Sequence, residues 1–250
     1  MSCSHLAGVV SGAAEADFNL GLQVNVDGLR SVLEYCRARP RPPVLVFASS
    51  LAVFGADPAI GPVGLVHDDT LPRPQSSYGI QKFIGEQLVA DYSRKGFVRG
   101  RSVRLMTVAV RPGSPNAAAS SFVSGIIREP LRGERAVCPV PPDTEIALSS
   151  PRRTIDGIFR AAAVTDAEWG SRTAMNLPAL TTTPRQMVEA LDRVSGRALG
   201  GLVDWASDDA IRAIVGSWPS RFHAERANRL GLEAESTIDE VIAAHLAEQT

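Results

Sequence analysis

Short apolar segments alternate with amphipathic helical segments through the first half of this chain, and that alternation limits the folds it can adopt. Residues 44–48 are apolar without interruption, as in a strand buried on both faces. A helix is predicted over residues 18–33, before Pro40, because apolar residues recur there at three-to-four spacing. A second helix is predicted from Ser77 onward, and a second buried strand over residues 101–110. This order indicates an α/β fold in which helices cover a parallel sheet.

The pattern changes in the second half of the chain. Helices are predicted over residues 120–128, 151–164 and 184–194. The short strands predicted between them cover residues 136–140, 145–148 and 174–177. We therefore predict a first region over residues 1–115 and a smaller, mainly helical region of α+β character over residues 116–250. The helix at residues 151–164 is a candidate to return to the first region.

Charge and composition argue against several classes of function. The formal net charge is −1, and Lys and Arg are scattered, so we expect no basic surface for nucleic acid or an anionic membrane. No stretch approaches the roughly 18 apolar residues of a membrane-spanning helix. The three cysteines lack CxxC spacing, which predicts reduced thiols and no disulfide or metal site: Cys3, Cys36 and Cys138. We expect a cytoplasmic protein whose partner is a small molecule.

Tyr78 and Lys82 lie four residues apart at the start of a predicted helix, so their side chains share one face. A tyrosine with its ordinary pKa of about 10 is a poor base at neutral pH, and we expect the ammonium of Lys82 to lower that pKa. A hydroxyl at the end of the preceding strand, from Ser50 or alternatively Ser49, could hydrogen-bond the same substrate oxygen. The pair alone is more often a solvated helix face. Its place after a buried strand and a long loop favours acid–base catalysis.

Three motifs in this order resemble the extended short-chain dehydrogenase and nucleotide-sugar epimerase superfamily. That superfamily carries HxAA or HxAG after one strand, SSxxVYG after the next, and YxxxK on the following helix. The chain has HLAG at residues 5–8, SSLAVFG at residues 49–55 with Phe54 for the usual aromatic residue, and YGIQK at residues 78–82. The resemblance implies a Rossmann-like, doubly wound parallel sheet and an NAD-dependent enzyme. Its implied catalytic residues are Ser50, Tyr78 and Lys82.

The resemblance also implies where NAD binds. Lys82 would hold the nicotinamide ribose, and the small residues Ala7 and Gly8 would let the backbone approach the cofactor closely. A tight turn after a strand is the alternative for Ala7 and Gly8, and a solvated or capping role is the alternative for Asn25. The implied cofactor-binding residues are Leu6, Ala7, Gly8, Asn25, Tyr78 and Lys82.

Longer stretches resemble a narrower group, the dehydrogenases of small sugar acids. These stretches include GVVSGAAEADFNLG, SSYGIQKFIGEQLVADYSRKGFV and RPGSPNAAASSFVSGIIREPLRGE. Such enzymes use NAD to oxidise the hydroxyl next to the carboxylate of a four-carbon sugar acid, giving the 2-keto acid. The substrate would contact Ser50 and Tyr78, and Arg128 could grip its carboxylate in bidentate fashion. A surface charge is the alternative for Arg128, and a helix cap for Ser120. Further candidate donors are Ser11, Asn116, Ser120 and Ser121.

One part of the superfamily pattern is absent from this chain. No GxGxxG turn precedes the HLAG motif at residues 5–8, although those glycines let the backbone approach the pyrophosphate. HLAG normally follows the fourth strand, so about 60 residues in two βα units are missing from the pattern. Residues 1–115 then form the C-terminal part of an NAD-binding domain. Either the natural protein is longer, or the chain lacks most of the cofactor site and exposes apolar edges.

Other readings stay open at this point. A nucleotide-sugar epimerase or dehydratase is the second enzyme class, and a non-catalytic remnant of the fold is the third possibility. The acidic residue that would separate NAD from NADP is absent. The resemblance also implies a homodimer that pairs through the YxxxK helix, with intramolecular packing as the alternative for its apolar residues Phe83, Leu88 and Tyr92.

Overall fold

The central feature of the fold is a parallel four-stranded sheet. It is seen in a computed structural model that describes residues 2–114 and 116–248. The strand order is β1-β2-β3-β7, and every neighbouring pair is parallel. The strands are β1 (Ser2–His5), β2 (Val44–Ser50), β3 (Arg99–Leu105) and β7 (Met175–Asn176). Six of the seven residues of β2 are buried, which explains the uninterrupted apolar run in its sequence.

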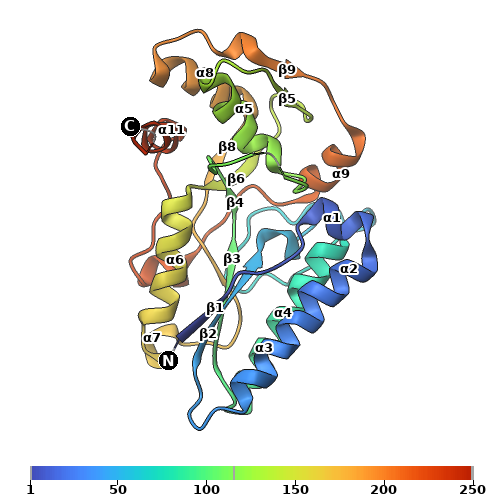
Figure 1. Cartoon of the computed structure of the whole chain (residues 1–250), viewed down its shortest axis with the longest axis vertical. Helices are drawn as coiled ribbons and strands as arrows, with labels where there is room; N and C mark the ends of the chain where they lie inside the picture. The colour runs from blue at the N-terminus through green and yellow to red at the C-terminus, as the bar shows by residue number, and fades with distance from the viewer. Residues whose placement is uncertain (1, 115, 249–250) are drawn as a thin grey trace.

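Helices cover both faces of this sheet, as a doubly wound fold requires (Figure 1). On one face lie α1 (Ser11–Ala16), α2 (Phe18–Leu22), α3 (Gly28–Arg37) and α4 (Ser77–Arg94). The opposite face carries α6 (Pro151–Ala163), which contacts β1, β2 and β3. The helix predicted over residues 18–33 is present but not uniform, since a π-helical turn at Gln23–Asp27 joins α2 to α3.

The strand predicted over residues 101–110 is wrong as a single element. β3 ends at Leu105, and after Met106 the chain enters β4 (Thr107–Val108) in a separate three-stranded sheet. That sheet contains β4, β6 (Ile146–Ser149) and β8 (Leu180–Thr182). Both strands are largely buried, so the apolar pattern runs on while the hydrogen-bonding partners change.

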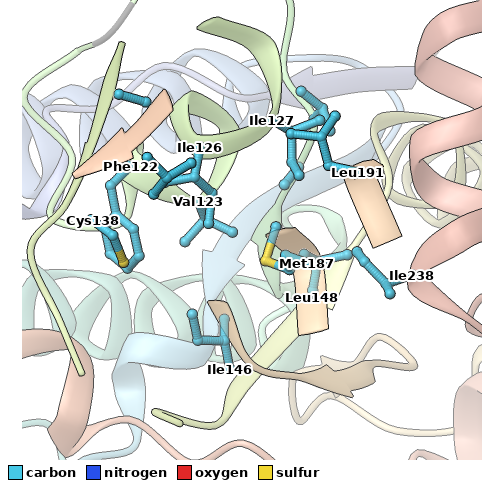
Figure 2. Close-up of a cluster of buried hydrophobic side chains, with 14 of the residues drawn as sticks. Phe122, Val123, Ile126, Ile127, Cys138, Ile146, Leu148, Met187, Leu191 and Ile238 are labelled. Atoms are coloured by element: carbon cyan, nitrogen blue, oxygen red, sulfur yellow. The ribbon is translucent and has the colours of Figure 1, made fainter. Parts of the chain in front are cut away.

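A second core lies above the main sheet, between α5 and α8 (Figures 1 and 2). Its elements are α5 (Ser121–Leu131), β5 (Ala136–Cys138), α8 (Pro184–Ser195), β9 (Val203–Trp205), α9 (Asp209–Ser217) and α11 (Ile238–Ala247). Thr183 caps α8 in a capping box, as its sequence indicates. Figure 2 labels part of this core: Phe122, Val123, Ile126, Ile127, Cys138, Ile146, Leu148, Met187, Leu191 and Ile238.

Two later segments of the chain join the first sheet. β7 pairs with β3, and α6 packs across β2 and β3 through a core that includes Ile158. Within the described residues, the only strand that pairs with β1 is β2. The helix α6, which contacts β1, has two exposed apolar side chains: Ile155 is 48% exposed and Phe159 is 68% exposed. The division of the chain at residues 115 and 116 therefore stays our proposal.

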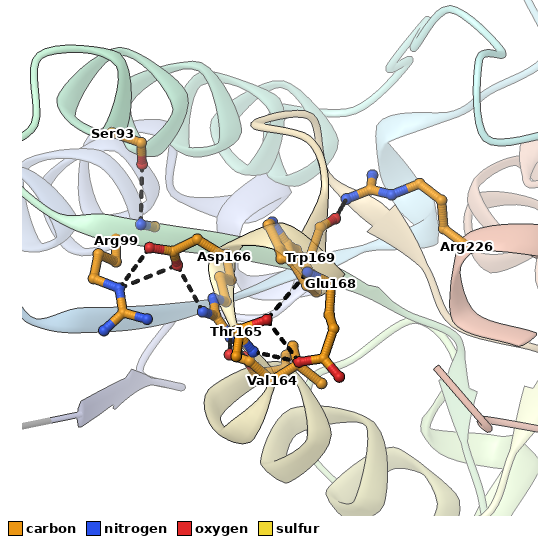
Figure 3. Close-up of polar contacts among 11 residues, drawn as sticks. Ser93, Arg99, Val164, Thr165, Asp166, Glu168, Trp169 and Arg226 are labelled. Carbon is orange, nitrogen blue, oxygen red and sulfur yellow. Dashed lines mark hydrogen bonds and ion pairs between the residues drawn. The ribbon is translucent and has the colours of Figure 1, made fainter. Parts of the chain in front are cut away.

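The edge of the sheet where β3 begins is closed by ion pairs (Figure 3). Asp166, in α7 (Asp166–Trp169), accepts hydrogen bonds from Arg99 and from the buried Arg101. A hollow of about 710 Å3 opens there between Arg99 and Trp169, larger than the cavity at the opposite edge. Arg99 and Asp166 in this hollow already form an ion pair with each other. The size of the hollow alone therefore does not identify it as the functional site.

The long helix α4 packs inward on the residues that suggested a dimer face. Phe83 packs against the cluster around Val53 and Phe54, while Leu88 and Tyr92 pack against the core under α3. The intramolecular alternative thus accounts for these three side chains. In the described part of the chain, no helix is both long and apolar enough to cross a membrane.

Candidate active site

The three sequence motifs meet at the carboxyl edge of the main sheet. Ser50 is the last residue of β2 and lies opposite Leu105 of β3. Tyr78 and Lys82 come from the first turns of α4, whose start is capped by Ser76. A cavity of about 190 Å3 is lined by all three motif side chains. Parallel strands place their carboxyl ends at one edge, so residues far apart in sequence converge there.

Ser49 and Ser50 both line the cavity, but their hydroxyls have different partners. The Ser49 hydroxyl donates a 2.5 Å hydrogen bond to Glu86, which forms a buried ion pair with Arg104. The hydroxyl of Ser50 accepts a hydrogen bond from the Ala52 amide and hydrogen-bonds the Tyr78 phenol. Ser50 is therefore the hydroxyl that a substrate oxygen can reach beside Tyr78.

Lys82 is buried, with only 5% of its surface exposed. Its ammonium donates a 2.9 Å hydrogen bond to the Ala48 carbonyl and lies 5.1 Å from the Phe47 ring centroid. Burial lowers the pKa of Lys82 to about 8, because desolvation penalises the charged form. At neutral pH the side chain still carries most of its charge, and it supplies a fixed cation inside the cavity.

The pKa of the Tyr78 phenol is shifted in the direction opposite to the one predicted from the sequence. Burial raises the pKa of its phenol above the ordinary value, and the hydrogen bond with Ser50 opposes that shift. The ammonium of Lys82 lies 5.5 Å from the Tyr78 ring centroid and does not bring the pKa below its ordinary value. The predicted lowering of the Tyr78 pKa is therefore wrong, because desolvation outweighs the hydrogen bond with Ser50.

Asn25 and Gly8 shape the loop that follows β1. The buried Asn25 amide accepts from the Val9 N–H at 2.8 Å and donates to the Val9 carbonyl and to Gln81. A Cβ at Gly8 would lie 3.0 Å from the Asn25 oxygen and 3.3 Å from the Lys82 ammonium nitrogen. Glycine is needed at this position because the backbone passes so close to Lys82.

The further substrate residues predicted from the sequence fall into three groups. Ser11 and Ser120 line the catalytic cavity, and Ser120 makes no side-chain cap to α5, so capping does not account for it. Asn116 and Ser121 line a neighbouring hollow of about 550 Å3. Arg128 is 2% exposed, and its guanidinium is held by the Arg111 carbonyl and by Glu129. It is not among the residues that line the catalytic cavity.

Other side chains in this cavity were not predicted as site residues. Arg111 lies three residues after the end of the short strand β4. This position near the end of a strand is the sequence feature that could have identified it as a site residue. Trp218 comes from the end of α9, more than a hundred residues further along the chain, and no local pattern links it to the site. Met106 and Thr107 complete the wall between the two sheets.

The residues after β1 fit the nicotinamide end of a dinucleotide. Leu6, Ala7 and Gly8 are exposed at the carboxyl end of β1, beside the ammonium of Lys82. The backbone at Gly8 has no space for a side chain on its inner side, which suits a loop that supports a flat ligand on its outer side. The chain contains no GxGxxG turn for the pyrophosphate. The fit therefore covers the ring and ribose that would lie near Tyr78 and Lys82.

Comparison with known proteins gives matches over most of the chain. Residues 3–147 match the NAD dependent epimerase/dehydratase family. D-erythronate dehydrogenase of Cupriavidus necator is 51% identical over 97% of this chain and 74% of its own length. The Haemophilus influenzae enzyme of the same name is 43% identical over 95% of this chain and 74% of its own length.

A solved structure with the same fold was also found. It is described as a nucleoside-diphosphate-sugar epimerase from Agrobacterium tumefaciens, with a TM-score of 0.88 and 39% identity. The match covers 98% of this chain and 72% of that one. The chain thus spans about three quarters of the length of these relatives.

Proposed function

Because this chain belongs to the NAD dependent epimerase/dehydratase family, we propose that it is a dehydrogenase that oxidises the 2-hydroxyl of a small sugar acid of the D-erythronate type. The product is the corresponding 2-keto acid. One observation carries the proposal: Ser50, Tyr78 and Lys82 line one small cavity at the carboxyl edge of the sheet. Support for the substrate class comes from the two relatives named D-erythronate dehydrogenase.

Tyr78 is the proposed base. As the C2–H bond breaks with its electron pair, the proton of the C2 hydroxyl passes to the Tyr78 oxygen and the C2–O bond becomes double. NAD, when bound, supplies the acceptor for the hydride. Ser50 donates a hydrogen bond to the reacting oxygen and aligns it with Tyr78. Lys82 favours the phenolate over the neutral phenol, since its ammonium lies 5.5 Å from the ring centroid.

Leu6, Ala7 and Gly8 are the proposed cofactor-contacting residues, with Lys82 at the nicotinamide ribose. Asn25 positions these residues indirectly, because its amide holds the backbone of Val9, the residue that follows Gly8. NAD is the proposed coenzyme because the matching family is described as NAD dependent. The cytoplasmic location and the homodimer predicted from the sequence stay predictions.

A nucleotide-sugar epimerase is the second candidate, because the Agrobacterium relative carries that description. The cavity beside Tyr78 measures about 190 Å3, below the roughly 300–1,000 Å3 of pockets that hold drug-sized ligands. A nucleoside-diphosphate sugar would have to extend beyond it, whereas a four-carbon acid would not. The small cavity is compatible with a four-carbon acid, and the two relatives named D-erythronate dehydrogenase favour it.

The test uses the purified chain with NAD and D-erythronate, and follows NADH by its absorbance. We expect NADH to accumulate with D-erythronate and not with a UDP-hexose, since a complete epimerase cycle leaves no net NADH. Thermal unfolding is measured in parallel, because NAD that binds the folded chain raises its melting temperature by mass action. Stabilisation without NADH formation from D-erythronate would contradict the substrate assignment. The absence of both would favour the non-catalytic remnant.

A further inference from the structure

The catalytic cavity contains two basic side chains and no acidic one. Lys82 and Arg111 line it, and the remaining lining residues in the described chain are apolar, aromatic or hydroxyl-bearing. Two basic side chains and no carboxylate give the lining of the cavity a positive charge. A cavity with this charge pattern is suited to a negatively charged ligand.

Arg111 is held at the cavity by two buried side chains of α5. Its backbone N–H donates a 3.0 Å hydrogen bond to the Ser124 hydroxyl, and its carbonyl accepts a 2.9 Å hydrogen bond from Arg128. Ser124 and Arg128 are 1% and 2% exposed. The main chain at Arg111 is thus tied to a rigid helix on both sides, which gives its side chain a defined origin at the cavity wall.

The guanidinium of Arg111 has no protein partner to balance its charge. Its Nε atom is buried without a hydrogen-bond partner, and no ion pair joins Arg111 to a carboxylate in the described part of the chain. Burial and the nearby charge of Arg128 both lower the pKa of Arg111. Arg111 is half-buried, so its charge is only partly solvated, and a bound carboxylate would give its guanidinium a partner.

Arg128 differs from Arg111 in having an ion pair, although its Nε atom is likewise buried without a hydrogen-bond partner. Its guanidinium forms an ion pair with Glu129 and donates to the Arg111 carbonyl. Those contacts occupy both of its terminal nitrogens inside the core. The charge of Arg128 is therefore used to support Arg111, while Arg111 itself faces the cavity with donors to spare.

We propose that Arg111 binds the substrate carboxylate, and that Ser120 at the start of α5 is a second donor to it. This inference rests on the proposed function, because it assigns the carboxylate of the same sugar acid. The carboxylate is bonded directly to C2, so holding it at Arg111 fixes where the C2 hydroxyl lies relative to Tyr78. Arg111 would then account for selection of acids over neutral polyols of the same length.

The experiment compares two ligands that differ in the carboxylate. D-erythronate and the neutral polyol erythritol are titrated into the chain with NAD present, by calorimetry and by thermal unfolding. Arg111→Met should weaken D-erythronate binding by roughly 10- to 100-fold, as expected for loss of a charge-assisted contact, and leave erythritol binding unchanged. Arg111→Lys should lie between the two, because it keeps the charge and loses the planar fork.

Arg172→Met is the matched control. Arg172 is exposed at the opposite edge of the sheet, so its removal deletes one positive charge away from the cavity. Retained D-erythronate affinity in Arg111→Met would overturn the inference, as would equal losses for both ligands in both Arg111 variants. Failure of the unmodified chain to bind D-erythronate, D-glycerate or glycolate would also overturn it. Binding that depends on Arg111 without NADH formation would instead contradict the dehydrogenase proposal and leave the Arg111 assignment standing.

Discussion

The ammonium of Lys82 donates a 2.9 Å hydrogen bond to the carbonyl of Ala48, two residues before the hydroxyl of Ser50. This contact ties the helix that carries Tyr78 to the strand that carries Ser50. The same burial that makes the contact possible penalises the charge of Lys82. Burying the charged Lys82 therefore lowers the free energy of unfolding, and this effect can be measured.

Lys82→Met should change how stability depends on pH. The pKa of Lys82 is about 8 in the folded chain and 10.5 in a solvated lysine, so the folded state carries a penalty for charge below pH 8. That penalty disappears as pH rises toward 10.5, because the unfolded chain binds the extra proton in that window. The shift corresponds to about 3 kcal/mol.

The measurement is denaturant unfolding of both proteins at neutral pH and at about pH 10. We expect the advantage of Lys82→Met over the unmodified chain to decrease by up to about 3 kcal/mol between the two conditions. A difference in unfolding free energy that does not change with pH would mean that Lys82 is not desolvated in solution.

Tyr78→Phe should lose most of the oxidation activity while the fold is kept. It removes the group that accepts the proton, together with its hydrogen bond to Ser50, so kcat should fall by roughly 100- to 10,000-fold. Tyr35→Phe is the control, because Tyr35 is exposed on α3, away from the cavity. Similar kcat values for Tyr78→Phe and Tyr35→Phe would exclude Tyr78 as the base.

The oxidation rate should rise with pH and then level off. Burial keeps Tyr78 protonated at neutral pH by raising its pKa, so the phenolate fraction grows about tenfold per pH unit. The supporting charge of Lys82 is lost above its pKa of about 8, which ends the rise there. The check is kcat against pH, and a rate already independent of pH below 7 would contradict the raised pKa of Tyr78.

Ser50→Ala and Ser49→Ala should have opposite consequences. Ser50→Ala should reduce kcat and cost only about 1 kcal/mol of stability, because Ser50 contacts Tyr78 at the cavity and caps the turn at Ala52. Ser49→Ala should cost about 1.5–3 kcal/mol of stability, because it removes a hydrogen bond to the buried carboxylate of Glu86. Activity and unfolding are measured on both variants. If Ser49→Ala had the larger effect on kcat at full stability, the two roles would be reversed.

Asn25→Ala should weaken NAD binding through the loop after β1. The change deletes two hydrogen bonds to Val9 and leaves Gln81 without its partner, so we expect a stability loss of about 2–3 kcal/mol. Asn19→Ala, at an exposed position on α2, controls for removal of an amide. NAD-induced stabilisation is compared in the two variants, and an unchanged response in Asn25→Ala would assign Asn25 to the fold alone.

Local pattern was enough to predict several elements and the motif residues. The apolar run of β2 and the three-to-four spacing of α4 depend on neighbours within one turn or one strand, so both could be predicted from the sequence. Tyr78 and Lys82 share a helix face by spacing alone. Their meeting with Ser50 also followed from the order strand, loop and helix, given the resemblance to a known superfamily.

Tertiary contacts decided the rest. Both Ser49 and Ser50 end β2 and line the cavity, and the hydroxyl of Ser49 is bound to Glu86, which pairs with Arg104 in the core. The break after Leu105 depends on which sheet offers a partner. The direction of the Tyr78 pKa depends on desolvation, which spacing along a helix does not reveal.

Arg111 and Arg128 show most clearly what the sequence predicts and what the tertiary structure decides. By itself, the sequence indicated Arg128 as one of several candidate donors to the carboxylate, with a surface charge as the alternative. Only the folded chain pairs Arg128 with Glu129 and leaves Arg111 without a counter-ion beside Tyr78. The physical reason is that helical and strand patterns depend on near neighbours along the chain, whereas the burial of a charge, and the cavity that it lines, depend on residues that only folding brings into contact.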